Sequence, residues 1–201
     1  AEVGPDEIAT TRRKEAAASA SSIGAHYECA EFRDLAIFDD DASRRRVTEL
    51  LRATAPEIVL TAAPVDYHCD HETTSRLVRD ACFGASAPNY KTGSAAALRA
   101  IPHLYFVDPV DMPSDAEFIV DVQSVMHQKR SMLACHASQR EWLRRQHGID
   151  DYIQTMEKWT SERGSVVGIE YGEGFRRYPG HPYPQTPLLE ELLRDHVILR
   201  R

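Results

Sequence analysis

Apolar residues recur at spacings of three and four in several parts of the chain, which predicts helices with one buried face. In residues 43–54 the apolar positions are Val47, Leu50 and Leu51, and Pro56 ends the pattern. Residues 73–83 show the same periodicity. The two segments are therefore expected to form helices on either side of a short strand.

Further helices are expected at the N-terminus and in the C-terminal half. An alanine- and serine-rich segment is expected to start near Asp6, whose carboxylate can cap free backbone N–H groups, and to end at Gly24. The other helices predicted from apolar periodicity and from glycine or aspartate at their ends cover residues 123–146, 150–164 and 188–193.

Short apolar runs predict the strands. Residues 57–61 (EIVLT) are rich in β-branched side chains and lie between proline-containing segments, as expected for a strand buried on both faces of a parallel sheet. Residues 103–109 and 117–122 are expected to be two more strands, and residues 26–32 a shorter one. The alternation of helices and strands predicts an α/β, Rossmann-like, mainly parallel sheet flanked by helices, in a single domain over residues 1–201.

The composition narrows the class of protein. The 201 residues are 42% hydrophobic and 27% charged, which is typical of one soluble globular domain. A net charge of -7 argues against nucleic acid as the main partner, because phosphate binding needs clustered Lys and Arg. No apolar run approaches the roughly 20 residues of a membrane span, and no leader is recognised, so a cytoplasmic protein with reduced cysteines is expected.

The segment DYHCDH, residues 66–71, concentrates groups that bind metals or carry protons. It follows an expected strand, at the edge where open α/β sheets collect ligands. Residues three apart share a face when a turn enters a helix, so His68 and His71 can face one small volume. A metal ligand and a proton-transfer group would then be neighbours. The alternative is that both histidines only cap the helix.

The DYHCDH turn and its surroundings resemble a known family. The stretch from Pro56 to Tyr90 is similar to the strand, loop and helix of the LmbE and PIG-L family of zinc-dependent de-N-acetylases, which typically show D-Y-H-P-D-H. RRKEAAASASSIGA, FIVDVQSVMHQKRSMLACHASQ and GIEYGEGF resemble flanking parts of that family, and the likeness covers most of residues 6–178. The resemblance implies an LmbE-like fold, zinc (Zn²⁺) as cofactor, a small-molecule N-acetylated amino sugar or conjugate as substrate, and a possible homo-oligomer.

The resemblance also implies roles for individual residues. His71 matches the zinc ligand, and His68 matches the histidine that stabilises the oxyanion and protonates the leaving amine. Asp70 would orient His68. The residues expected on the substrate side are Arg12, Asp39 and His136.

Two departures from the family change what is expected of this chain. Cys69 replaces the usual proline. The family's first strand and its Pro-His-Pro-Asp-Asp motif, which supplies two more zinc ligands and the general base, have no match. A single imidazole cannot hold Zn²⁺, so we expect these elements upstream of Ala1 and the 201 residues alone to be inactive.

Two other functions stay open at this point. One is a catalytically silent LmbE-like subunit for ligand binding or assembly, which the absent motif favours. The other is a metal-dependent hydrolase of different specificity, with ligands from Asp108 or Asp121.

Overall fold

The computed structural model describes residues 3–148 and 150–200. Two compact units make up the fold. The first comprises Ala1–Cys29 and Val122–Gly172, and the second Ala30–Asp121 and Glu173–Arg201. The candidate histidine pair lies in the second unit, which also contains the sheet.

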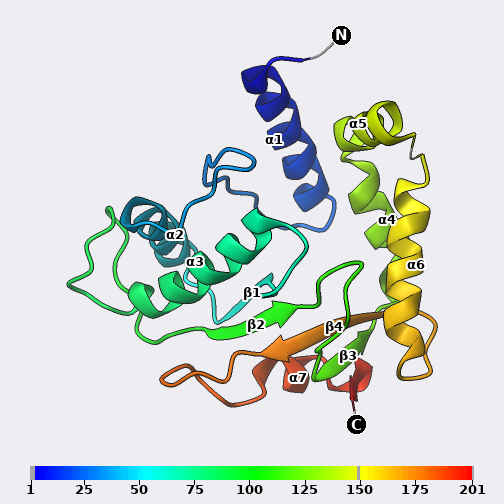
Figure 1. The fold of residues 1–201 in the computed structure, drawn as a ribbon. Helices are drawn as coiled ribbons and strands as arrows, with labels where there is room; N and C mark the ends of the chain where they lie inside the picture. Colours follow the sequence, from blue (N-terminus) through cyan, green and yellow to red (C-terminus); the bar gives the residue numbers. More distant parts are fainter. Residues whose placement is uncertain (1–2, 149, 201) are drawn as a thin grey trace. The chain divides into compact units, whose positions relative to one another are not determined.

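The sheet of the second unit has the strand order β1-β2-β4-β3-β5 (Figure 1). The strands are β1 (Ile58–Ala62), β2 (His103–Val107), β3 (Phe118–Asp121), β4 (Gly172–Arg177) and β5 (Val197–Leu199). β1 and β2 are parallel, whereas β4 runs antiparallel to β2 and β5 antiparallel to β3. The α/β class is confirmed, but the prediction of a mainly parallel sheet is wrong. The antiparallel strands were not predicted, because β4 (GEGFRR) and the three-residue β5 contain no long apolar run.

The first strand differs from its prediction. Val59 of β1 is 9% exposed, but its neighbour Leu60 is 48% exposed. β1 is therefore buried on one face only, as the alternation of buried and exposed residues along it shows. On β2, Leu104 and Phe106 pack with Val59 and with Cys82 in the core.

Tyr105 of β2 anchors a short helix, α7 (Leu188–Leu192). Its hydroxyl donates to Oε2 of Glu190 over 2.7 Å and accepts the Leu189 N–H over 3.1 Å. The short 3₁₀ helix η2 (Arg194–His196) follows α7 and leads into β5. The predicted short helix near the C-terminus is thereby confirmed.

Two helices of the second unit pack against each other and cover the β1 and β2 side of the sheet (Figure 1). α2 (Asp41–Thr54) begins at Asp40, whose carboxylate accepts the Ser43 N–H, and ends at Ala55 in the left-handed conformation. α3 (Cys69–Ala85) starts four residues earlier than predicted. The reason is that His68 serves as its N-cap, so the helix begins between the two histidines.

The first unit is helical. It contains α1 (Pro5–Ser21), the 3₁₀ helix η1 (Gln123–Val125), α4 (Met126–Ala134), α5 (Ala137–His147) and α6 (Tyr152–Ser165). α1 starts after Gly4 without the side-chain cap expected from Asp6, and it ends three residues before Gly24. Every helix in the described part of the chain is too short or too polar to cross a membrane.

Two predictions for the first unit are wrong. Residues 123–146 do not form one helix but break at Cys135 and His136. The break is stabilised by Glu15 of α1, whose carboxylate accepts the N–H and the hydroxyl of Ser138 over 2.8 and 2.6 Å and so caps the start of α5. Residues 26–32 form no strand, and Glu31 has a φ of 62°, which interrupts an extended chain.

Candidate active site at the start of helix α3

The DYHCDH turn lines an open pocket of about 340 Å³ in the second unit. Half of the lining comes from α3 and its N-cap and half from the loop that precedes α2. The lining residues are Phe32, Arg33, Asp34, Ile37, His68, Asp70, His71 and Thr74. The pocket therefore brings together the three residues that were expected to carry the chemistry.

His71 is oriented by Asp66, a residue that the sequence analysis did not assign. Nδ1 of His71 lies 2.9 Å from Oδ1 of Asp66, whose side chain is 6% exposed, while the His71 side chain is 45% exposed. The carboxylate can only accept, so Nδ1 carries the proton, and in the neutral ring Nε2 keeps a lone pair. Metal-binding histidines commonly have this arrangement, with the second ring nitrogen bonded to a carboxylate. The signal was present in the sequence, since Asp66 belongs to the same motif.

His68 has the opposite tautomer. Its Nδ1 accepts the backbone N–H of Asp70 over 3.2 Å, so in the neutral ring the proton is on Nε2. The His68 and His71 rings are stacked with centroids 4.8 Å apart, and Tyr67 contacts both edge-on. A hydrogen-bond donor and a ring nitrogen with a free lone pair thus come from adjacent rings.

The carboxylate of Asp70 is engaged with a distant loop. Asp70 is 7% exposed, and its oxygens accept the backbone N–H of Leu35 over 2.6 Å and that of Ile37 over 3.4 Å. The resemblance implies that Asp70 orients His68. The bond between the two residues instead runs from the backbone N–H of Asp70 to the ring of His68.

The side chains of the DYHCDH turn can supply one ligand to a zinc ion. Ligand atoms of His68, Cys69 and Asp70 lie within 4.8 Å of one another. Nδ1 of His68 and the Asp70 carboxylate are already occupied by backbone N–H groups, so this trio does not suit a metal. Nε2 of His71 does suit one, whereas zinc takes three or four protein ligands. Within residues 3–148 and 150–200, no other group of three ligand side chains gathers, at Asp108 or elsewhere.

The remaining predicted residues lie elsewhere. Asp39 pairs with Arg44 over 2.9 Å and with Arg76 at 4.0 Å, and it is not among the residues that line the pocket. Arg12 and His136 belong to the first unit. Arg12 donates to Oε1 of Gln139 over 2.7 Å, which ties α1 to α5.

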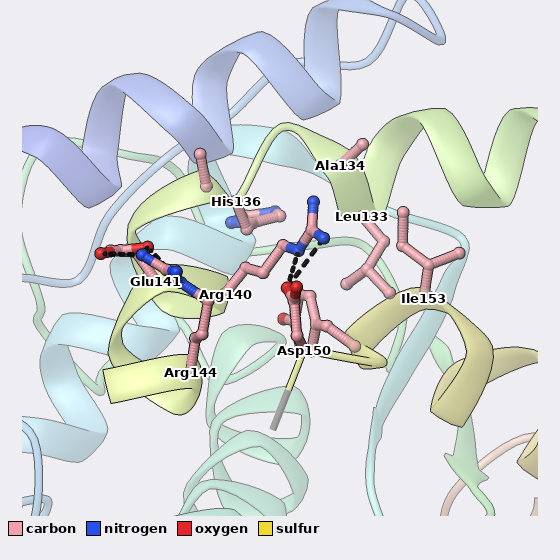
Figure 2. A pocket seen from close by; sticks show the side chains of 10 residues that line it. Leu133, Ala134, His136, Arg140, Glu141, Arg144, Asp150 and Ile153 are labelled. Atoms are coloured by element: carbon pink, nitrogen blue, oxygen red, sulfur yellow. Dashed lines mark hydrogen bonds and ion pairs between the residues drawn. The ribbon is translucent and has the colours of Figure 1, made fainter. Parts of the chain in front are cut away.

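His136 lines a second pocket, of about 480 Å³, within the first unit (Figure 2). Arg140 reaches across to Asp150 and bonds its Oδ1 over 3.0 Å from Nε and 2.8 Å from Nη2. Glu141 accepts from Arg144 and Arg145, and these bonds lower the pKa of Glu141 to about 2. The charges around His136 are therefore largely neutralised in pairs.

Comparison with known proteins identifies related chains. Residues 1–82 match the family model described as PIG-L, GlcNAc-PI de-N-acetylase. The chain is 29% identical over 138 residues to the 4-oxalmesaconate hydratase of Pseudomonas putida, which covers 66% of this chain and 52% of that protein. The chain thus spans about half the length of this curated relative.

Solved structures share the fold. A conserved protein from Thermus thermophilus gives a TM-score of 0.73 at 22% identity, covering 93% of this chain and 79% of that one. The 4-carboxy-2-hydroxymuconate hydratase of Pseudomonas putida gives 0.68 at 24%, covering 92% and 78%. The N,N'-diacetylchitobiose deacetylase of Pyrococcus horikoshii gives 0.66 at 24%, covering 91% and 70%. Residues 1–82 are therefore similar to the PIG-L (GlcNAc-PI de-N-acetylase) family, and the chain shares its fold with a deacetylase of known structure.

Proposed function

We propose that this chain is part of a zinc-dependent de-N-acetylase that acts on an N-acetylated amino sugar or its conjugate. The observation that carries the proposal is the pair of stacked imidazoles in one pocket, His68 and His71, whose hydrogen bonds assign them opposite tautomers. The family match and the fold support the same reaction class.

The two histidines have different tasks in this proposal. His71 offers Nε2 as a metal ligand, and the buried carboxylate of Asp66 holds its ring in place and increases its basicity. His68 presents Nε2–H to the oxygen that becomes negative when water attacks the acyl carbon, and then passes that proton to the departing amine. Bound zinc supplies a Lewis acid and acidifies a water molecule. In this proposal His71 supplies one of the three or four protein ligands that zinc needs, and the remaining ligands and the general base are not assigned to residues of this chain.

Substitutions in the protein that contains this chain separate the two roles. His71→Ala is expected to lower the zinc content, measured by mass spectrometry of the metal. His68→Ala is expected to keep the zinc but to lower the rate of acetate release about 10²- to 10⁴-fold, the range of general acid–base catalysis. Asp66→Asn should weaken zinc affinity about 10- to 100-fold, because the ring loses its carboxylate partner. His127→Ala, an exposed histidine of α4, is the matched control. Full zinc and full rate in both histidine variants would refute the proposal.

A hydratase is the second candidate, and the 29% identity to the 4-oxalmesaconate hydratase favours it. Hydration of a carbon–carbon double bond also needs an activated water and a proton donor, but the proton goes to carbon rather than to nitrogen. Loss of the 4-oxalmesaconate ultraviolet absorbance, without acetate release from any N-acetyl sugar, would establish the hydratase. No turnover of either substrate would favour the catalytically silent relative.

A further inference from the structure

A turn in the loop before α2 forms one wall of the histidine pocket. The Ala36 N–H donates to the carbonyl of Arg33 over 3.2 Å, and Arg33 and Asp34 line the pocket. Leu35, within this turn, has a φ of 58°, a conformation that residues with a side chain rarely adopt. The turn is therefore held in shape by contacts outside itself.

Asp70 supplies those contacts. Its buried carboxylate accepts the N–H groups of Leu35 and Ile37, on either side of Ala36. The same residue donates its own N–H to the ring of His68. One side chain of the histidine motif thus sets the position of the turn that carries Arg33, and such strained segments concentrate at functional sites.

Arg33 lines the pocket, and within the described part of the chain its charge has no ion-pair partner. Other arginines of this unit, such as Arg44 and Arg176, have carboxylates at 2.9 and 2.6 Å. Arg33 is exposed, and no side chain of the described residues forms an ion pair with its guanidinium. This holds also for Asp34, its neighbour in the sequence. A guanidinium has five donors arranged to bind a carboxylate or a phosphate with two parallel bonds.

We infer that Arg33 binds an anionic group of the substrate, a carboxylate or a phosphate, and that Asp70 is the positioning residue for Arg33. The inference rests on the proposed function and deepens it: the substrate is an N-acetylated amino sugar that carries a negative charge. Arg33 is thus a residue that determines specificity, while His68 and His71 determine the reaction.

Three N-acetyl sugars of different charge test the inference in the protein that contains this chain. They are neutral N-acetylglucosamine, its 6-phosphate, and N-acetylmuramic acid, which carries a carboxylate. We expect kcat/KM to be higher for one anionic sugar than for the neutral one, and the sugar that is preferred identifies phosphate or carboxylate as the group bound. Arg33→Gln should lower this preference roughly 10- to 100-fold, mainly through KM, because one charge-assisted contact is lost.

Conservative and matched variants sharpen the result. Arg33→Lys keeps the charge but not the two parallel bonds, so it should restore part of the preference. Arg99→Gln removes an exposed arginine that does not line the pocket and should leave all three rates unchanged. Asp70→Asn should speed hydrogen exchange at the Leu35 and Ile37 amides, measured by NMR, and should lower the preference for anionic sugars as well.

The outcomes separate this inference from the proposed function. Acetate release with equal kcat/KM for neutral and anionic sugars would overturn the role of Arg33 and leave the de-N-acetylase intact. If no sugar releases acetate, the proposed function fails, and titration of the protein with inorganic phosphate and with acetate still tests the anion site. The Arg33 Nε–H resonance is assigned by NMR as the signal that disappears in Arg33→Gln. A shift of this resonance on addition of phosphate or acetate supports the site, and a resonance that neither anion moves overturns it.

Discussion

Arg52 is expected to be a main determinant of stability in the second unit, although it belongs to no candidate site. It is 7% exposed on α2 and bonds the end of α3. Nε donates to the carbonyl of Ala85 over 3.1 Å, and Nη2 donates to the carbonyls of Gly84 and Ala87 over 3.1 and 2.8 Å. Nη1 donates to Oγ1 of Thr92 over 3.1 Å. A cation at this position also suits the negative end of the α3 dipole.

The loss from Arg52→Met can be estimated from these contacts. Three bonds from a charged group to carbonyls contribute a gross of about 5–9 kcal/mol, at roughly 1.5–3 kcal/mol each. Each carbonyl keeps a backbone donor, from Ala87, Leu98 or Tyr90, so none is left unpaired. Removing the charge also recovers several kcal/mol of desolvation. We therefore expect the free energy of unfolding to fall by about 2–4 kcal/mol.

Urea unfolding followed by circular dichroism measures the effect as a shift of the midpoint at unchanged slope. Methionine and arginine have similar helix propensities, so the change isolates the lost bonds. Arg99→Met, at an exposed arginine of the same unit, is the control and should change stability by no more than about 0.5 kcal/mol. A difference between the two variants below about 1 kcal/mol would refute the reasoning, since it lies under the range expected for a single charged bond.

Three further predictions follow from buried groups of the same unit. Tyr105→Phe should destabilise by about 1–2 kcal/mol in urea, because the Leu189 N–H and Glu190 lose their shared hydroxyl. Burial raises the pKa of Tyr105 from 10.0 and that of Cys82 from 9.0, each to about 12. The folded state thus keeps protons that the unfolded chain has lost, so stability is full below about pH 9 and falls as pH rises toward 12, and a flat profile by circular dichroism over that window would contradict this. Exposed Cys69 should react with Ellman's reagent in native buffer and buried Cys82 only in denaturant, as mass spectrometry of labelled peptides can show.

The predictable part of the fold is the part with a local signal. The helix predicted over residues 43–54 is α2, and the apolar runs near residues 103 and 118 are β2 and β3. β4 escaped prediction because GEGFRR has no apolar run, and its place in the sheet depends on pairing with β2, far away in sequence. The break between α4 and α5 likewise depends on Glu15, more than 120 residues earlier in the chain.

The candidate site shows the same division. A shared volume for His68 and His71 followed from their spacing, and the structure places both rings in one pocket. The bonds from the Asp70 carboxylate to Leu35 and Ile37 could not be read from the sequence, because nothing local marks a loop 35 residues upstream as its partner. Arg33 enters the pocket through that loop and was missed for the same reason.

Helix capping and proton transfer are not competing roles for His68, because the capping bond decides which ring nitrogen carries the proton. As the N-cap of α3, His68 commits Nδ1 to the Asp70 N–H, and this bond leaves the ring proton on Nε2. Without the cap the neutral ring could exchange its two tautomers, and one of them would present a lone pair at Nε2 where a donor is needed. His71, three residues later in the first turn, is bound at Nδ1 by a carboxylate and so has the reverse assignment. The start of α3 thereby distinguishes two imidazoles of one motif, which is the chemical difference that the proposed reaction requires.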